Sequence, residues 1–407
     1  MNEQRDSSPS GYRWTILFVF VLINTVLQMQ WLTFAPIARE ARVFYQVSPL
    51  QIDLLSMIFM GVFLVVCIPA SYVIDTYGIR KGVGFGACLI GICSLLKGVF
   101  GDSYPAVVIC QTGLAVAQPF VINAGTKIAG NWFPINERAT AVGIATLSQF
   151  IGIIIAMILT PLLIKPNAEG IYQIQEMLFL YGMIALSGAL ILLIFLKERP
   201  VDIGNADSYE ERFTVLEGFR HMTGIKDIRF ILVLFFIGLG MFNAISTCID
   251  QICQEKGLSI EQTGLVGGMM LIAGIIGAII LPIFSDKSRK RKRFIILGMI
   301  CMTPGLVGLT VFSDYLLLVS SFIFGFFLLG ASAPIGFQYA AEISYPSPES
   351  TSQGLILLTG QISGILFIVA MNMLGIALFM KIFIGLAVIN IILTFLIDES
   401  PMILSNT

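Results

Sequence analysis

Six side chains that could hold a small polar or cationic ligand interrupt otherwise apolar stretches of this sequence. A polar group buried in lipid without a partner is costly, so each needs a partner in the protein or in a ligand. An indole ring attracts cations to its face, and amide groups hydrogen-bond hydroxyl groups. Hydrogen bonds between neighbouring helices are the alternative use of these amides. The candidate substrate-binding residues are Trp31, Gln30, Gln118, Gln149, Asn243 and Gln361.

Charged side chains at the ends of the apolar stretches form a second group, whose chemistry would be ion pairing. The pattern Asp-x4-Arg occurs twice, as Asp75 to Arg80 and as Asp286 to Arg291. We expect Asp75 and Asp286 to bridge to neighbouring helices when the inner side is closed, and these pairs to break on opening. A simple topology signal is the alternative interpretation of the basic residues. The other candidate gate residues are Glu137, Arg138 and Glu349.

Acids deep inside an apolar stretch would indicate proton coupling, and none occupies the middle of one. Asp53 and Asp250 lie near outer ends, where Asp53 could cap the start of a helix. Lys127 lies near an inner boundary, and we expect its long side chain to snorkel to the membrane surface. If the chain carries a solute across a membrane, the sequence favours uncoupled movement, with proton coupling as the alternative.

Residue types that other chemistries need are scarce. The one histidine, His221, lies in a charged connecting segment, which excludes a His-ligated metal or haem inside the membrane. The seven cysteines lie within or beside apolar runs, as is typical of small buried hydrophobic residues rather than disulfides or metal ligands. The sequence contains no phosphate-binding loop. We therefore expect neither an enzyme nor an ATP-driven pump, no catalytic residues, and no cofactor or metal.

The composition of the 407 residues requires a membrane. Hydrophobic residues make up 57% and charged residues 12%, with a mean hydropathy of +0.90. A soluble domain carries roughly 25% charged residues, so this chain cannot cover a water-facing surface. A formal net charge of −1 gives no general attraction to nucleic acid. The expected partners are the lipid bilayer and a small-molecule substrate, and we expect a monomer.

Apolar runs of about 20 residues, the length that crosses a bilayer, recur along the chain. The only long polar stretch divides them into two groups of six, which predicts two six-helix bundles (14–196 and 229–397), a linker (197–228) and two tails (1–13 and 398–407). The first run is too long for a signal peptide, so we expect it to be retained. The twelve predicted spans are 14–38, 50–74, 82–100, 104–130, 138–164, 176–196, 229–253, 259–284, 293–313, 315–342, 351–374 and 378–397.

Lysine and arginine set the orientation of such spans. With the N-terminus inside, 18 of the 24 Lys and Arg residues fall on the inner side and 6, including Lys97, on the outer side. We therefore predict cytoplasmic termini in a multi-pass protein of the plasma membrane.

The two halves also repeat. Phe133-Pro134-x-x-Glu137 and Tyr345-Pro346-x-x-Glu349 are 212 residues apart, as are Gln149 and Gln361, and the Asp-x4-Arg copies are 211 apart. Two six-helix halves in parallel repeat resemble the major facilitator superfamily. The segment from Asp75 to Lys81 resembles the signature which that superfamily carries between spans 2 and 3. The same offset pairs Asn243 with Trp31, which predicts that both face the central axis.

Several short blocks resemble a narrower family, the feline leukaemia virus subgroup C receptor-related transporters, which are associated with haem and with choline and ethanolamine. The blocks are Gln30-Trp31, Ile52 to Met57, Val116-Ala117-Gln118, Trp132-Phe133, and Tyr345-Pro346 with Glu349, Thr351 and Gly354. The resemblance implies that Trp31 contacts a quaternary ammonium group and that Gln118 and Gln361 contact the polar end. The aromatic position of span 7 in that family corresponds to Asn243 here, and its asparagine before the tryptophan corresponds to Leu27.

The sequence thus predicts an all-α carrier with twelve transmembrane helices in two pseudo-symmetric bundles, the major facilitator fold. We expect it to move a small polar or cationic metabolite, choline-like or ethanolamine-like, by alternating access as a facilitator. One alternative is a proton-coupled symporter of organic anions, for which Lys127 is the candidate cation. Haem export is another, and a membrane receptor on the same scaffold is a third.

Overall fold

The computed structural model describes residues 11–167, 170, 172–198, 224–344 and 349–400, and the elements named within them are all helices. Twelve helical spans, some of them interrupted, are long and apolar enough to cross a membrane. The all-α, twelve-span architecture is thereby confirmed. Span 7 begins at Lys226 rather than 229, inside the predicted linker, most of which lies outside the described residues.

The helices follow one another in two sets, one for each half of the chain. The N-terminal half contains α1 (Tyr12–Trp31), η1 (Ala35–Ile37), α2 (Ala38–Tyr45), α3 (Pro49–Tyr77), α4 (Ile79–Val99), α5 (Tyr104–Ile122), α6 (Gly125–Trp132), α7 (Ile135–Leu163) and α8 (Gln175–Phe195). The C-terminal half contains α10 (Lys226–Thr247), α11 (Ile249–Gln254), α12 (Ile260–Ser288), α13 (Arg291–Val311), α14 (Tyr315–Gly330), η2 (Ala331–Gly336), α15 (Phe337–Ile343), α16 (Glu349–Leu374) and α17 (Ile376–Leu396).

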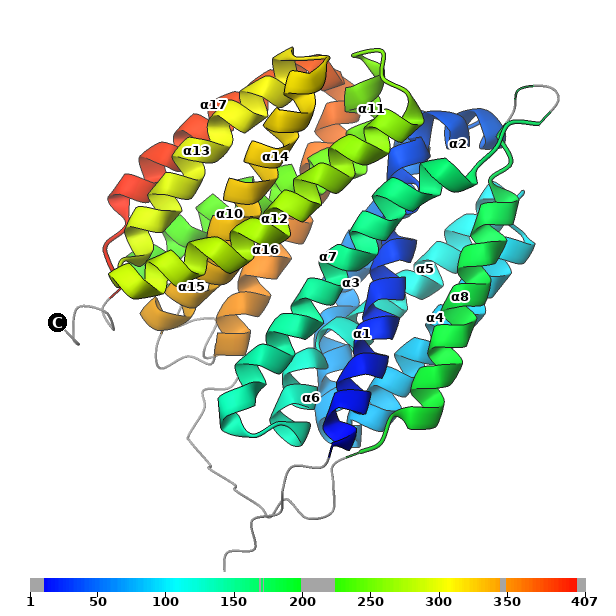
Figure 1. The fold of residues 1–407 in the computed structure, drawn as a ribbon, viewed down its shortest axis with the longest axis horizontal. Coiled ribbons are helices and arrows are strands. Elements are labelled where there is room, and N and C mark those ends of the chain that lie inside the picture. The colour runs from blue at the N-terminus through cyan, green and yellow to red at the C-terminus, as the bar shows by residue number, and fades with distance from the viewer. Residues whose placement is uncertain (1–10, 168–169, 171, 199–223, 345–348, 401–407) are drawn as a thin grey trace, which may run out of the picture.

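The two halves form separate bundles that lie side by side (Figure 1). Short helices α2 and α11 lie at one end of the molecule, which we call the α2–α11 end, whereas α6 and α15 lie at the opposite, α6–α15 end. Between the bundles, α7 packs along α12 and α3 packs along α16. Spans 2 and 5 of the first half therefore meet spans 8 and 11 of the second.

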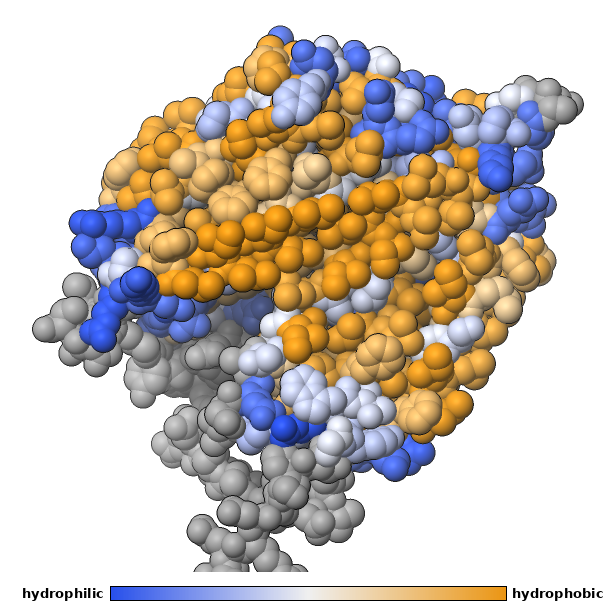
Figure 2. Space-filling view, viewed as in Figure 1, coloured by the Kyte–Doolittle hydropathy of each residue, from blue (hydrophilic) through white to orange (hydrophobic). Residues whose placement is uncertain are grey.

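The surface has the polarity pattern of a membrane protein. Apolar side chains cover the middle of the visible face and hydrophilic ones gather at the ends (Figure 2). On α12, for example, at least half of the surface of Ile279, Ile283 and Phe284 is exposed. An apolar belt between two polar rims matches the hydrocarbon core of a bilayer and its two water-facing borders.

Spans 1, 4, 7 and 10 are each interrupted, whereas the sequence analysis treated each as one continuous run. The break in span 1 includes Pro36, and that in span 10 is the π-helical η2, which contains Pro334. In span 4 the helix ends at Asn123, four residues after Pro119. Proline lacks the N–H that would continue the helical ladder. Every third span is therefore built of two helical pieces.

Spans 2 and 8 begin with the same capping box. The Ser48 hydroxyl accepts from the Gln51 N–H while the Gln51 side chain accepts from the Ser48 N–H, and Ser259 and Gln262 repeat both bonds. Such boxes satisfy N–H groups that the helix itself leaves unpaired. Their spacing of 211 residues (259 minus 48) equals that of Asp75 and Asp286 and supports the duplication.

Candidate substrate site and gate

Trp31 is the last residue of α1, at the break in span 1. Its side chain is 8% exposed, and its Nε1 donates to the backbone carbonyl of Ser56 on α3 at 3.1 Å. The Ser56 hydroxyl in turn donates to the Trp31 carbonyl at 3.4 Å. The indole is thus held in one orientation with its N–H already used, which leaves its ring face as the contact it can offer a ligand.

Three glutamines well inside spans carry free amides: Gln118 on α5, Gln149 on α7 and Gln361 on α16. Gln118 is 5% exposed and the other two are half-buried. Within the described residues no hydrogen bond reaches these amides, and none of their atoms is among the orphaned buried ones. The three amides therefore touch space that water or a small ligand can enter, and they come from both halves.

Asn243 uses its amide differently. Its Nδ2 donates to the carbonyl of Gly360 on α16 at 3.1 Å, and the side chain is 7% exposed. A Cβ added to Gly364 would lie 2.9 Å from Asn243 Cβ and 3.0 Å from the Met60 sulfur on α3. Gly364 thus allows helices of both halves to meet at this level. Asn243 lies beside the interface between the halves, which agrees with the position expected from its offset to Trp31.

Gln30 lies inside the N-terminal bundle. Its Nε2 donates to the Tyr181 carbonyl on α8 at 3.3 Å, whereas its Oε1 is buried without a partner. The backbone carbonyl of residue 30 accepts from Gln111 Nε2 on α5 at 3.1 Å. Gln111 Oε1 in turn accepts from Lys97 Nζ on α4 at 3.1 Å. Gln30, Gln111 and Lys97 are completely buried. The geometry gives no support to Gln30 as a substrate contact, because its side chain is completely buried and its Nε2 is bonded within the bundle.

The burial of Lys97 is a feature that sequence analysis did not predict. Counted there among the outer basic residues, it is enclosed between α1, α4 and α5, with its ammonium 5.8 Å from the centroid of the Phe34 ring. No carboxylate in the described part of the chain pairs with it. The signal that could have revealed it was its place inside an apolar helix rather than in the loop that follows.

At the α2–α11 end an ion pair that the sequence did not reveal joins the two halves. Arg39 of α2 faces Asp250 of α11: its Nε donates to Oδ1 at 2.8 Å and its backbone N–H to Oδ2 at 2.6 Å. The same guanidinium donates to the Leu258 carbonyl at 2.7 Å and the Thr263 hydroxyl at 3.3 Å. The Asp250 side chain is fully buried. Charge-assisted bonds of this geometry are strong and specific.

Asp53 on α3 is a second buried acid at this end. The prediction that it caps α3 is wrong, because Ser48 does so. Asp53 is 2% exposed, and its Oδ2 accepts from Gln251 Nε2 and from Asn372 Nδ2, each at 2.7 Å, with the Cys248 thiol 3.6 Å away. All three partners belong to the C-terminal half. The other carboxyl oxygen, Oδ1, is sealed from solvent without a partner.

Both acids therefore join the two halves at the α2–α11 end. Among the described residues, the hydrogen bonds and ion pairs that connect the two halves all lie here. These residues form the gate at this end; we use "gate" for Arg39, Asp53, Asp250, Gln251 and Asn372.

At the α6–α15 end, the described ion pairs of Arg13, Lys127 and Arg291 each join helices of one half. Lys127 on α6 donates to Asp75 at 3.3 Å and to the Ile74 carbonyl at 2.6 Å. Its ammonium thus reaches a largely exposed carboxylate at the end of α3, and its snorkelling stays a prediction. Arg291 pairs with Asp286 and contacts Glu342 of α15 at 3.3 Å. Asp75 thus pairs with span 4 and Asp286 with span 9, each within its own half.

These pairs cannot lock the halves together, since each joins helices of one bundle, and they are present while the α2–α11 end is closed. The expectation that they break when the α6–α15 end opens therefore finds no support here.

The remaining predicted gate residues behave in the same local way. Glu137 pairs with Arg13 of α1 at 3.0 Å. Arg138 Nε donates to the Phe133 carbonyl at 3.1 Å, and the Arg80 side chain is exposed. The side chain of Glu349 lies outside the described residues.

Two acids that sequence analysis did not single out cap the third helical span of each half. Glu198 accepts from the backbone N–H groups of Ile79 and Arg80 at 3.1 and 2.8 Å. Glu399 accepts from those of Arg291 and Lys292 at 2.8 and 3.1 Å. A carboxylate at a helix N-terminus satisfies free N–H groups and complements the helix dipole. Each acid comes shortly after the last span of its own half, so both halves have the same carboxylate cap at the same place.

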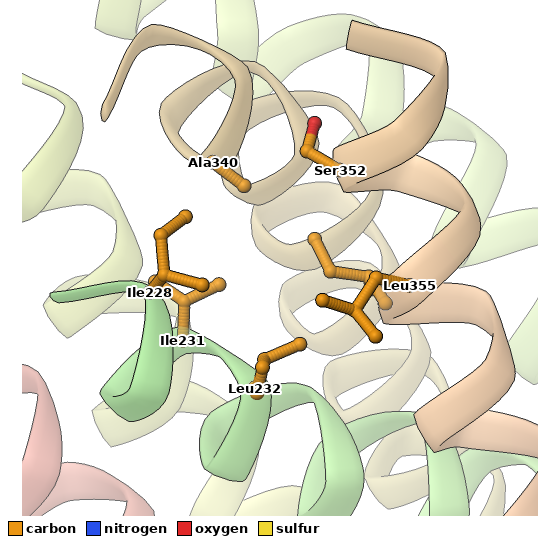
Figure 3. Close-up of a pocket in the computed structure, with 7 residues that line it drawn as sticks. Ile228, Ile231, Leu232, Ala340, Ser352 and Leu355 are labelled. Carbon is orange, nitrogen blue, oxygen red and sulfur yellow. The ribbon is translucent and has the colours of Figure 1, made fainter. Parts of the chain in front are cut away.

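A shallow pocket of about 180 Å³, counting space open to solvent, lies elsewhere, within the C-terminal half (Figure 3). Its walls are apolar apart from one hydroxyl; they are Ile228, Ile231, Leu232, Ala340, Ser352, Leu355 and Ile356. Because none of the predicted site residues lines it, and it lies in one half only, it is not the candidate substrate site.

Known proteins share both the sequence and the fold of this chain. A sequence model of the Major Facilitator Superfamily matches residues 14–368. Solute carrier family 49 member A3 of Danio rerio is 31% identical over 89% of this chain and 78% of its own length. The choline/ethanolamine transporter FLVCR2 of Homo sapiens is 29% identical over 89% of this chain and 72% of its own. The resemblance to the feline leukaemia virus receptor-related transporters is thereby confirmed.

Among solved structures, a bacterial homologue of the human lysosomal transporter Spinster, in an inward-facing and unoccupied conformation, superimposes with a TM-score of 0.78. The superposition covers 95% of this chain and 97% of that one at 15% identity, which establishes the shared fold.

Proposed function

This chain belongs to the major facilitator superfamily, and on that premise we propose that it carries a small polar or cationic metabolite by alternating access. The observation that carries the proposal is the set of free amides, Gln118 and Gln149 from one half and Gln361 from the other, well inside the spans. A polar group left unpaired in lipid is costly, so amides from both halves that reach accessible space fit a ligand between the halves.

The substrate that fits best is a choline-like or ethanolamine-like amine. Trp31 offers a ring face, worth about 0.5–2 kcal/mol to a cation, and the amides of Gln118 and Gln361 offer oxygen and nitrogen to a hydroxyl group. Relatives named choline/ethanolamine transporters support the same class. Asn243 takes the place of an aromatic residue, so we expect weaker cation binding than a two-ring cage provides.

We further propose that the α6–α15 end faces the cytoplasm of the plasma membrane. The basic residues support this orientation, since Arg80, Lys81 and the run from Lys287 to Arg293 all lie at that end, and lysine and arginine accumulate on the cytoplasmic side. The closed α2–α11 end would then be extracellular, and the protein faces inward in this conformation.

Facilitated transport fits better than the anion alternative. A proton-coupled carrier of organic anions would need a free cation in the substrate site, and Lys127, its candidate, is held by Asp75 and the Ile74 carbonyl. We therefore keep the uncoupled carrier as the proposal.

Uptake of labelled choline into proteoliposomes, with and without an inside-negative potential, tests the proposal. One elementary charge gains about 2.3 kcal/mol per 100 mV, so uniport of a cation should raise its accumulation about 50-fold at that voltage. Trp31→Ala should lower the affinity for choline, by about 30-fold if the ring contact is worth about 2 kcal/mol, whereas Trp14→Ala, at the exposed start of α1, should not. Absence of saturable uptake by folded protein, or normal uptake by Trp31→Ala, would overturn the proposed site.

A further inference from the structure

The two acids of the gate are satisfied in very different ways. Asp250 has a dedicated guanidinium, from Arg39, and a backbone N–H on its second oxygen. Asp53 has only neutral donors, and the amides of Gln251 and Asn372 both bond Oδ2. Oδ1 of Asp53 is sealed and unpartnered, although the side chain as a whole is 2% exposed. Asp250 therefore has a cation that offsets its charge, whereas the hydrogen-bond donors of Asp53 are neutral.

From this contrast we propose that Asp53 is a proton-binding site: its carboxyl group takes up one proton when the gate closes and releases it when the halves separate. On closing, water delivers the proton and an O–H bond forms on Oδ1. On opening, that bond breaks and the proton returns to water at the α2–α11 end. No electron transfer and no other reactant is needed.

The surroundings of Asp53 favour the neutral acid while the gate is closed. An ionised carboxylate removed from water costs several kcal/mol unless a cation offsets it. Its hydrogen-bonding neighbours from the other half are the two amides and the Cys248 thiol, none of them a cation. The gate's other acid, Asp250, has the same charge sign, and the gate's guanidinium, from Arg39, is already bound to it.

Separation of the halves exposes Asp53 to water, because its three neighbours all belong to the C-terminal half and move away together. Hydrated Asp53 is then an ordinary aspartic acid, ionised at neutral pH. The closed gate thus binds one proton more than the open gate. Closure is favoured in acid and is progressively lost as the pH rises, by at most tenfold in the open-to-closed ratio per pH unit for one proton.

The inference rests on the proposed alternating access only for the existence of a state open at the α2–α11 end. It needs no substrate, so a failure to transport choline would leave it standing. Its consequence for transport is that protons outside the cell hold the carrier in its inward-facing conformation.

A pair of spin labels across the gate measures the closure directly. Val43 of α2 and Glu255, just after α11, are exposed and lie on opposite halves, so both accept labels at introduced cysteines. Native cysteines are replaced by alanine, except Cys248→Ser, which keeps a hydrogen-bond donor. The fractions of short and long distances are then recorded in nanodiscs between about pH 5 and about pH 8.

We expect the long-distance fraction to grow with pH in the parent protein and in Asp53→Glu, and to be independent of pH in Asp53→Asn. A double variant, Arg39→Met with Asp250→Asn, removes the neighbouring ion pair without leaving a buried charge unpaired, and it should keep the pH dependence. A flat profile in the parent, or an equal slope in Asp53→Asn, would overturn the proposal.

Infrared difference spectra between acid and alkaline pH provide the second measurement in case Asp53→Asn does not fold. The parent should show a carboxylic-acid C=O band that shifts in Asp53→Glu. If the band is absent, or does not shift, Asp53 is not the group that binds the proton.

Discussion

The gate ion pair gives a prediction whose size can be worked out from the structure. Arg39→Met keeps the length of the side chain but removes every guanidinium bond, leaving the fully buried Asp250 carboxylate with only the backbone N–H of residue 39. Removing one partner of a buried pair costs about 3–5 kcal/mol. We take the lower end, about 3 kcal/mol, because that backbone bond remains. The closed conformation should lose about a hundredfold in population relative to the open one.

Cys253 reports this change, because it is completely buried on α11 beside the gate. In a variant with no other cysteine, a membrane-impermeant thiol reagent at fixed pH should label Cys253 about a hundredfold faster after Arg39→Met. Arg42→Met, one turn further along α2, is the matched control and should change the rate little. Adding Asp250→Asn to Arg39→Met should restore slow labelling, since no buried charge is left unpaired. Unchanged labelling in Arg39→Met, or equally fast labelling in the double variant, would refute the argument.

Three further outcomes follow from contacts described above. Gly364→Ala should lower uptake at normal expression, because the added Cβ would lie 2.9 Å from Asn243 Cβ. Gly354→Ala is the control: its Cβ would meet no atom within 4 Å, and uptake should not change. Glu198→Gln and Glu399→Gln should each lower the stability of the protein by about 1 kcal/mol, additively, in thermal unfolding of detergent-solubilised protein, since each weakens a helix cap in a different half. Lys97→Met should leave the unfolding temperature unchanged or raise it, because an apolar side chain of similar length replaces a buried amine that no acid pairs; a clear loss would assign the ammonium a stabilising role.

The spans could be predicted because lipid imposes a simple rule on composition. Span 9 was placed at 293–313 and runs from Arg291 to Val311; span 12 was placed at 378–397 and runs from Ile376 to Leu396. The breaks in spans 1, 4, 7 and 10 were missed, because apolar residues continue across them and hydropathy does not register a change of helix direction. The proline in span 1 was a usable signal, whereas the break at Cys248 has no comparable marker.

The gate could not be predicted, because its contacts join positions far apart in the chain. Arg39 and Asp250 are separated by 211 residues, and Asp53 and Asn372 by 319. Sequence gives the depth of each residue in its span but not which face of the helix it occupies or which span lies opposite. For the same reason Gln30 and Gln118 looked alike in sequence, although one amide is bonded inside a bundle and the other is free.

The polar contacts differ between the two ends of the protein, and this difference constrains how the protein can open. Within each bundle, carboxylate caps and ion pairs hold the α6–α15 end together, so each half can move as one body. Opening the gate breaks the Arg39–Asp250 pair and several hydrogen bonds to Asp53, each worth about 1 kcal/mol net. A carrier that cycles needs its two end states to be close in free energy, so new contacts at the α6–α15 end must offset this loss. Side chains that are now exposed at the α6–α15 end would make these new contacts. Arg80 is one described candidate, because its side chain is exposed and its backbone N–H is already bonded to Glu198.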